Sequence, residues 1–249
     1  MEKVAICAVI KDEHPYLKEW LDYHFTIGVT DIHLYEDDGS LSHYDICKEY
    51  SNVFLHDLLG FIGDRFNGSI KQGELYNRFI KTYKDDVDYV FFIDLDEFVS
   101  FDEGYTLSDL MELCRKEGAV LLPWKMYGAD GLIENPKRKV VETFRKPVRL
   151  SRKDIHMPYK SFVYMKNDSR ENFMSTHHRH AMAAMSRLNT KTWYRLNHYV
   201  TKSWEEWCER IFKRGQIQRN YRRLDEFFEY NPDMASIKEE LYSTIKEKI

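Results

Sequence analysis

Apolar runs and amphipathic stretches alternate along the first hundred residues. Four short runs, each bounded by polar turns, have the β-branched and aromatic content of buried strands. They cover residues 4–10, 32–35, 53–55 and 89–93. After the first run, His14-Pro15 opens a stretch in which apolar residues recur at helical spacing until Gly28. Residues 70–83 predict a second helix before the fourth strand.

The rest of the chain has less regular patterning. A helix over 106–116, closed by Gly118, precedes a strand at 119–124. Ser203-Trp-Glu-Glu206 forms a capping box at the start of a later helix. The other expected elements are short β-rich pieces at 139–165, an irregular stretch at 166–192, a strand at 195–200, and helices over 203–215, 216–230 and the tail after Pro232. No internal repeat or low-complexity linker interrupts the 249 residues.

The order of strands and helices predicts an α/β fold with a central, mostly parallel sheet. Residues 1–100 alternate strand and helix as a Rossmann-like nucleotide-binding half does. Residues 101–200 then form a second half, and 201–249 form C-terminal helices. We expect all of them to belong to one domain.

The fourth apolar run, Tyr89 to Ile93, ends in three acidic residues, Asp94, Asp96 and Glu97. On an extended backbone Asp94 and Asp96 share a side, at the carboxyl edge where open α/β sheets bind ligands. Two close carboxylates repel each other, and Mg²⁺ or Mn²⁺ can bind to them together with phosphate oxygens. The pattern favours a metal site; the alternative is an acidic, solvated turn.

Two further loops carry candidate nucleotide contacts. Lys11 and Glu13 lie just before a helix N-terminus, which suits an anion or the edge of a nucleotide. Asp37 opens an acidic turn after the second strand, and its carboxylate could accept from a base N–H and from ribose hydroxyls. Each loop is equally compatible with an ordinary solvated turn.

Histidines and basic residues cluster in the second half of the chain. His177, His178 and His180 stand together in the irregular stretch, and imidazole is compatible with Mn²⁺ beside carboxylates. His198 is instead compatible with a buried histidine on a strand. The C-terminal helices are basic, which is typical of a solvated face, of diphosphate contact or of contact with an anionic membrane. Their basic residues are Lys202, Arg210, Lys213, Arg214, Arg219, Arg222 and Arg223.

Composition excludes several classes of protein. Hydrophobic residues make up 43% of the chain, enough for a sizeable core, and the net charge of −4 provides no basic field for nucleic acid. The four cysteines are far apart, which predicts reduced thiols and a cytoplasmic protein. No apolar run reaches the length of a membrane span, and we expect no signal peptide.

Together these residues resemble glycosyltransferase family 92 and its bacterial relatives, which are allied to family 2 and have a GT-A fold. The resemblance runs from about residue 4 to 230. Its specific blocks are Phe92-Ile-Asp-Leu-Asp-Glu-Phe98 and Asn197-His-Tyr-Val-x-Lys-Ser203. The supporting motifs are Val9-Ile-Lys-Asp-Glu13, Leu17-x-Glu-Trp20, His24, Gly28-Val29, Tyr35-x-x-x-x-Ser40, Trp124-x-x-x-Gly128, Lys160-Ser-Phe-Val163 and Lys213-Arg-Gly215.

The resemblance implies transfer of a sugar from a nucleotide sugar, UDP-linked, to a saccharide or glycolipid acceptor. It implies Mn²⁺, or Mg²⁺, at Asp94 and Asp96, with His177 or His198 completing the site and Asp37 against the base. We place His177 ahead of His198. A cytoplasmic, bacterial-type enzyme of surface polysaccharide synthesis, with peripheral membrane contact through its basic helices, fits this analogy. The sequence departs from the family at Asp12, where Asn is usual, and at Tyr127, where Phe is common.

The mechanistic hypothesis follows from charge. A metal would stabilise the leaving diphosphate, and Lys213 would assist it. If the reaction inverts the anomeric centre, a carboxylate must take the acceptor's proton, and Asp130 is the first candidate, ahead of Glu134 and Asp154. Trp124 and Tyr127 would stack on the acceptor sugar.

Two other functions stay open on the sequence alone. A haloacid-dehalogenase-like phosphatase also has Asp-x-Asp at a strand end, although on its first strand and followed by Gly-Thr. A sugar-nucleotide-binding protein without turnover is the non-enzymatic alternative.

Overall fold

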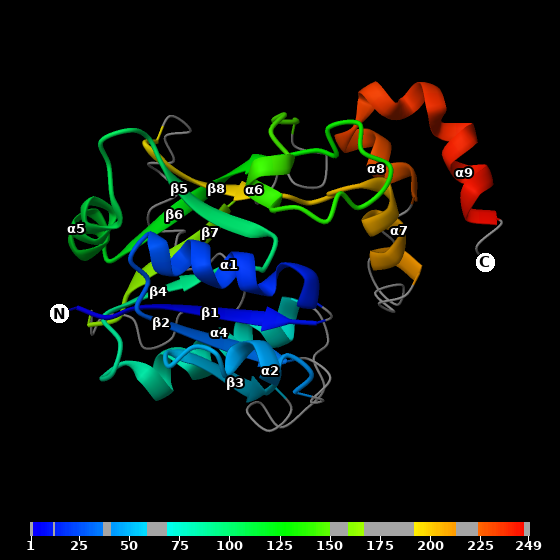
Figure 1. Ribbon diagram of the computed structural model, residues 1–249. Helices are drawn as coiled ribbons and strands as arrows, with labels where there is room; N and C mark the ends of the chain where they lie inside the picture. The colour runs from blue at the N-terminus through cyan, green and yellow to red at the C-terminus, as the bar shows by residue number, and fades with distance from the viewer. Residues whose placement is uncertain are drawn as a thin grey trace. The chain divides into compact units, whose positions relative to one another are not determined.

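The computed structural model describes residues 2–11, 13–36, 41–58, 69–149, 159–166, 192–212 and 224–246 (Figure 1). Among these residues, eight strands form one sheet in the order β3-β2-β1-β4-β7-β6-β8-β5. The strands are β1 Val4–Ile10, β2 Asp31–Glu36, β3 Val53–Asp57, β4 Tyr89–Phe92, β5 Glu97–Phe101, β6 Ala119–Met126, β7 Tyr159–Tyr164 and β8 Tyr194–His198. The helices are α1 His14–Thr26, α2 Tyr44–Cys47, α4 Ser69–Tyr83, α5 Leu107–Glu117, α6 Val140–Thr143, α7 Trp204–Phe212, α8 Leu224–Tyr230, the 3₁₀ helix η6 Pro232–Ile237 and α9 Lys238–Lys246.

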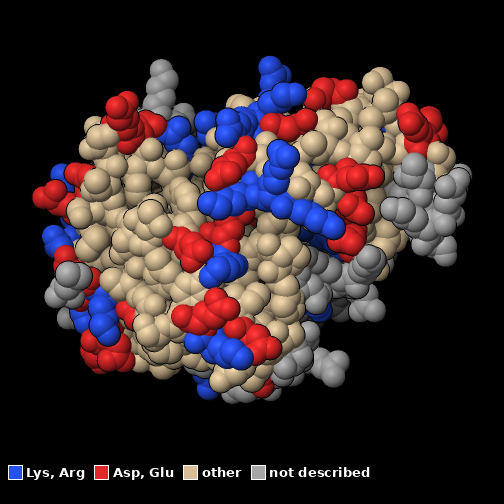
Figure 2. All heavy atoms as spheres, in the orientation of Figure 1, with Lys and Arg blue, Asp and Glu red and all other residues tan. Residues whose placement is uncertain are grey.

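Contacts divide the chain into two compact units. The first unit comprises Met1–Trp124 and Met157–Asn197, and the second comprises Lys125–His156 and His198–Ile249. On the face that Figure 2 shows, acidic and basic side chains are interspersed, in keeping with the near-balance of charge. No helix among the described residues is long and apolar enough to cross a membrane.

The parallel half of the sheet confirms the predicted strands. β1 pairs in parallel with β2 and with β4, and β2 pairs in parallel with β3. Ile10 of β1 lies opposite Glu36 of β2, so both strands end at the same level. β7 then pairs antiparallel with β4 and with β6. The carboxyl ends of β1, β2 and β4 therefore share one edge, where open α/β sheets bind ligands.

One face of this parallel sheet is covered by α4. Alternate residues of β1, Ala5 and Cys7, are fully buried in a core cluster with Leu75, Tyr76 and Phe79 of α4. The residues between them point to the opposite face, because successive side chains of a strand alternate. Burying each large apolar side chain contributes on the order of 1.5–3 kcal/mol. Because β1 and β4 are buried on both faces, apolar residues are favoured at consecutive positions, which explains their continuous apolar pattern. The four cysteines are free thiols, as predicted.

Helix α1 hydrogen-bonds to the backbone of β5. Trp20 Nε1 donates to Glu97 O at 2.8 Å, and the Tyr23 hydroxyl donates to Val99 O at 2.7 Å. His24 Nδ1 lies 2.8 Å from Trp20 O, and its Nε2 lies 3.5 Å from the Val99 amide nitrogen. Burial lowers the pKa of His24 to about 3, so the ring is neutral in the folded chain.

A loop of the second unit is held by amide groups. Asn231, which is 2% exposed, accepts the Ala129 N–H at 2.5 Å and donates to Phe227 O at 2.8 Å. A Cβ on Gly128 would lie 2.5 Å from Asn231 Oδ1 and 2.8 Å from Val148 Cγ1, so only glycine fits. The predicted capping box is present: the Glu206 N–H donates to Ser203 Oγ at 3.3 Å, and the Ser203 N–H donates to Glu206 Oε2 at 3.2 Å.

Three expectations need correction. β5 directly follows the acidic turn and was not predicted. Residues 140–143 form the short helix α6, so the β-rich interpretation of 139–165 is wrong there. Lys202 and Arg210 are 3% and 8% exposed, and Arg210 donates to Val200 O at 2.9 Å. The solvated face, one of the three alternatives for the basic residues, is therefore wrong for these two. The other five residues of that set, and the stretch 167–191, lie outside the described residues.

Candidate functional site

The acidic residues after β4 lie in a turn. The backbone leaves β4 at Phe92 and enters β5 at Glu97, with the Glu97 N–H donating to Asp94 O at 3.1 Å. The Asp94 N–H in turn donates to Glu97 Oε2 at 2.8 Å. The expected extended backbone at Asp94 and Asp96 is therefore wrong, because this pair of hydrogen bonds bends the chain. The acids do lie at the carboxyl edge of the parallel strands, as predicted.

A buried lysine neutralises part of this turn. Lys160 of β7 is 3% exposed, and its Nζ donates to Asp94 Oδ2 at 2.6 Å. The same Nζ lies 3.8 Å from Glu97 Oε1. Gln72 of α4 donates to the other Asp94 oxygen at 3.1 Å. Both oxygens of Asp94 are therefore held by side chains of the first unit.

The charges in this cluster depend on one another. Burial raises the pKa of Glu97 well above its usual range, and Asp94 and Asp96 raise it further, while Lys160 opposes the shift. Burial alone would lower the pKa of Lys160, but Asp94 and Glu97 outweigh it and the pKa is raised. Lys160 therefore keeps its positive charge although it is buried. Breaking such a cluster by removing one partner leaves an uncompensated buried charge.

The predicted nucleotide loops are described only in part. Lys11 and Glu13 follow β1 at the carboxyl edge of the sheet, and both are half-buried. The Glu13 N–H donates to His43 Nε2 at 3.0 Å. Asp12 and Asp37 lie outside the described residues. Contact of these loops with a nucleotide stays a prediction.

The candidates for acceptor chemistry are described in part as well. Asp130 adopts a left-handed backbone, φ 53°, and its carboxylate accepts the N–H groups of Arg145 at 2.8 Å and Lys146 at 3.0 Å. The Tyr127 ring stacks on Tyr199 with centroids 4.9 Å apart. Their predicted roles remain predictions; Glu134 is exposed, and Asp154 lies outside the described residues.

Trp124 lies near the buried lysine of the first unit. Lys160 Nζ is 6.0 Å from the centroid of the Trp124 ring, within reach of a cation–π interaction. An acceptor sugar stacked on this ring would therefore lie close to the acidic turn, although stacking itself stays a prediction.

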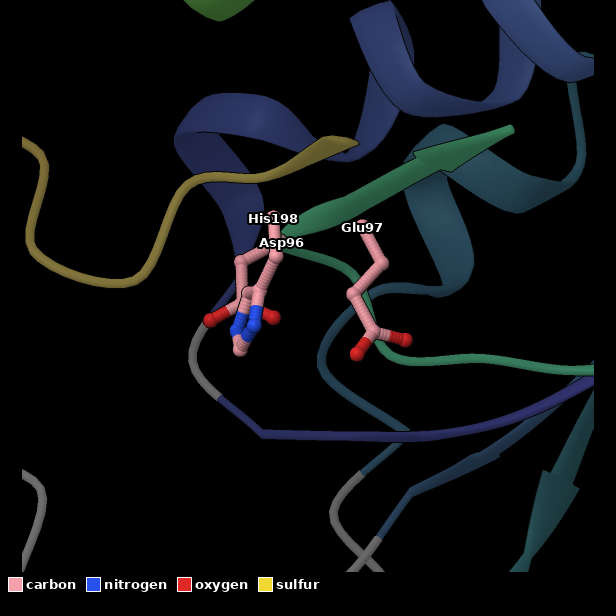
Figure 3. Close-up of side chains that lie close together, drawn as sticks. All are labelled: Asp96, Glu97 and His198. Atoms are coloured by element: carbon pink, nitrogen blue, oxygen red, sulfur yellow. The ribbon is translucent and has the colours of Figure 1, made fainter. Parts of the chain in front are cut away.

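Of the predicted histidine ligands, only His198 is described. It is the last residue of β8, which neighbours β5 in the sheet order, and it is 6% exposed. Figure 3 shows its side chain together with those of Asp96 and Glu97 at the start of β5. His177 and Lys213 lie outside the described residues.

The sequence matches a known family over nearly its whole length. A model of glycosyltransferase family 92 matches residues 2–249. The chain belongs to glycosyltransferase family 92. It has the α/β fold that was expected, with β3-β2-β1-β4 as the parallel half of the sheet. A family 92 protein of rice, Oryza sativa subsp. japonica, is 23% identical over 206 residues. That alignment covers 81% of this chain, which spans about a third, 34%, of the rice protein.

Solved structures of glycosyltransferases are among the distant structural neighbours. Glucosyl-3-phosphoglycerate synthase from Mycobacterium tuberculosis, in complex with Mn²⁺, UDP and phosphoglyceric acid, is 14% identical with a TM-score of 0.36. The match covers 66% of this family 92 chain and 56% of the synthase. The glycosyltransferase GlyE of Streptococcus pneumoniae TIGR4 is 13% identical, with a TM-score of 0.36, 98% of this chain covered and 64% of GlyE. At such low TM-scores, neither neighbour identifies a site residue of this family 92 chain.

Lys160 and His43 are two residues of the site region that sequence reasoning did not assign. Lys160 stands in the Lys160-Ser-Phe-Val163 motif, where a lysine inside an apolar strand pattern is a signal of a buried partner. His43 follows an acidic, Ser-containing turn and carries no such signal.

Proposed function

We propose that this family 92 chain transfers a sugar, in the simplest case a hexose, from a UDP-linked donor to a glycan or lipid-linked saccharide in surface polysaccharide synthesis. The acidic turn between β4 and β5 is the observation that carries the proposal. Asp94, Asp96 and Glu97 meet at the carboxyl edge of parallel strands, and Lys160 is the one buried cation beside them among the described residues. A diphosphate can approach such an edge only when further positive charge accompanies it.

A divalent cation, Mn²⁺ or Mg²⁺, would supply this charge. Asp96, Glu97 and His198 form a group of described residues whose ligand atoms suit one metal ion. Carboxylate and imidazole ligands together are compatible with Mn²⁺. We propose Asp96 as the principal ligand, because Lys160 and Gln72 hold both oxygens of Asp94. His198 is the proposed histidine, since β8 neighbours β5, and His177 remains the alternative.

The residues around the metal would then act as follows. The metal would stabilise negative charge that develops on the leaving diphosphate. Lys160 and Gln72 would fix the Asp94 carboxylate, and the Glu97 side chain would fix the turn that presents Asp96. Lys11, Glu13, Asp37 and Lys213 are the proposed donor contacts. For an inverting reaction, Asp130 would take the acceptor's proton, and Trp124 and Tyr127 would stack on the acceptor sugar.

The metal site is tested by nucleotide binding to the full chain. In thermal unfolding, UDP at about a hundred times its dissociation constant should raise the unfolding free energy by about 2.7 kcal/mol. We expect most of this increase only when Mn²⁺ is present. Asp96→Asn, which keeps the side-chain volume, should lose the Mn²⁺-dependent part. Asp85→Asn is the matched control, because Asp85 is exposed and precedes β4 at its opposite end.

The result that would contradict the metal site is a full Mn²⁺-dependent increase in Asp96→Asn. Catalysis needs a separate measurement, because a protein without turnover would bind UDP equally well. Release of UDP from UDP-sugars, with and without saccharide acceptors, distinguishes the two. Family membership favours a transferase over a phosphatase, and hydrolysis of a generic phosphate ester in place of the UDP-sugar would reverse that preference.

A further inference from the structure

A buried histidine joins the chain segments that follow β1 and β2. His43 is 0% exposed, and Glu36, the last residue of β2, is 1% exposed. His43 Nδ1 hydrogen-bonds to Glu36 Oε1, which also accepts the Ser42 hydroxyl at 2.7 Å. On the other side of the ring, Nε2 accepts the Glu13 N–H at 3.0 Å. A single side chain therefore connects the end of β2 to the start of α1.

The hydrogen bonds define the state of the ring. A backbone N–H can only donate, so Nε2 of His43 carries no proton and the proton resides on Nδ1. Nδ1 then donates to Glu36. Because both ring nitrogens are engaged, His43 has no hydrogen bond left to offer a ligand. His14 stacks on the ring with centroids 4.0 Å apart, which fixes it further.

The position of this histidine links it to donor binding. Ile10 and Glu36 lie opposite each other in the register of β1 and β2, so His43 sits where both strands end. Lys11 and Glu13, the proposed donor contacts of this edge, follow Ile10 directly. The Glu13 amide is the group that His43 holds, and Glu13 is the N-cap of α1. A shift of His43 would therefore shift the segment that faces the nucleotide.

We propose that His43, oriented by Glu36, is a positioning residue of the donor site. It sets the affinity for the nucleotide through Glu13 without touching the nucleotide itself. The inference rests on the proposed function, because it assumes that the donor nucleotide binds at this edge. It adds a pair of buried residues, Glu36 and His43, that determine how well Glu13 is positioned before the donor arrives.

The test is titration of the full chain with UDP, with and without Mn²⁺. His43→Phe removes both hydrogen bonds and should lower UDP affinity about tenfold, the expected effect of losing one buried partner. His43→Gln can still accept the Glu13 N–H and should recover part of the affinity. Since the effect is on positioning, the KM for the donor should rise while kcat at saturating donor stays unchanged.

His33→Phe is the matched control. Like His43, His33 is buried, 5% exposed, but it lies within β2, away from the strand ends. The centroid of its ring is 4.8 Å from that of Phe54 on β3. A general loss of stability would affect both variants, whereas loss of UDP affinity should be confined to His43→Phe. If His43→Phe does not fold, His43→Gln and Ser42→Ala test the proposal instead. Each removes only some of the hydrogen bonds among Glu13, Glu36, Ser42 and His43, and each should weaken UDP binding several-fold.

Two results would overturn the proposal in different ways. UDP affinity equal to wild type in the His43 variants, or an equal loss in His33→Phe, would overturn the positioning role alone. A wild-type chain that binds no UDP, with or without Mn²⁺, would overturn the proposed donor site and the positioning role with it.

Discussion

Two arrangements of polar groups, one in each compact unit, are held in different ways. At the acidic turn of the first unit, the charge of the buried Lys160 is balanced by Asp94 and by the buried Glu97. The loop of the second unit around Gly128 is held by the amide of Asn231 and by backbone N–H groups on Asp130. One arrangement depends on charge state, and the other depends on shape and hydrogen-bond geometry.

The two arrangements differ in how strongly each contact depends on its neighbours. Removing one member of a charged cluster leaves its partners uncompensated, so under the proposed function the same residues would determine both folding and ligand binding in the first unit. Removing one contact of the amide-held loop around Gly128 loses only that contact and leaves no charge without a partner. Four predictions test this contrast, in order of decreasing effect.

The largest effect is expected for Lys160→Met. Asp94 and Glu97 would keep their places without the buried cation, which should cost about 3–5 kcal/mol of unfolding free energy. Urea unfolding of the full chain measures it. Lys166→Met is the control, because Lys166 is exposed near the end of β7 and should cost less than about 1 kcal/mol. Equal unfolding free energies of the two variants would contradict a stabilising role of the charged cluster around Lys160.

Acid should destabilise the first unit through its neutral histidines. Burial lowers the pKa of His24 and of His33 to about 3, with nearby His56 and Lys3 lowering that of His33 further. Between pH 6.5 and 3 the unfolded chain binds more protons, so their contribution is complete above 6.5 and lost as the pH falls. From pH 7 to 5 the loss should be about 2 kcal/mol for each histidine, or about 4 kcal/mol together. The raised pKa of Glu97 acts in the opposite direction and reduces the net change.

Urea unfolding at the two pH values measures the total, and hydrogen exchange locates it. We expect the amides of β1, β2 and α1 to lose more protection at pH 5 than those of the second unit. Stability that does not change between pH 7 and pH 5 would show that these rings are not buried as neutral groups.

Asp130→Asn separates structure from catalysis in the second unit. The asparagine oxygen can still accept the N–H groups of Arg145 and Lys146, so the unfolding free energy should change by less than about 1 kcal/mol. If Asp130 is the base, kcat should nevertheless fall by about a hundredfold or more, because an amide cannot take a proton. Sugar transfer at the wild-type rate would contradict a role of Asp130 as the base and would leave it a structural role only.

Gly128→Ala tests the shape of the same loop through the free energy of unfolding. The new Cβ would meet Asn231 and Val148 at less than 3 Å, and overpacking of this kind costs about 1–3 kcal/mol. Because no charge is involved, the loss should be the same at pH 7 and pH 5, in contrast to the first unit. Thermal unfolding at both pH values measures the loss of unfolding free energy. A loss that depends strongly on pH would contradict the view that this loop is held by shape and not by charge.

Much of the fold could be predicted from periodicity. The apolar runs that became β1 and β4 are buried on both faces, and continuous burial leaves a clear pattern in the sequence. β5 was missed because its first residue, Glu97, is a buried acid that reads as part of a polar turn. The hydrogen bonds from Trp20 and Tyr23 that place this strand cross more than seventy positions of sequence.

The site could be predicted only in part. Asp94 and Asp96 are adjacent in sequence to a strong strand, so their place at the sheet edge followed directly. Lys160 reaches Asp94 because β7 pairs antiparallel with β4, and the partner of a strand cannot be read from either strand alone. His43 meets Glu13 only because β1 and β2 end together.

The contacts between α1 and β5 have a consequence for solubility. β5 is the last strand in the sheet order, and an outermost strand with open N–H and C=O groups can recruit another chain and aggregate. Glu97 O and Val99 O, two residues apart, point to the same side of the strand, and Trp20 and Tyr23 occupy both acceptors. The helix thus takes the place that a further strand would fill, so Trp20 and Tyr23 cover this edge of the sheet as well as supporting the fold.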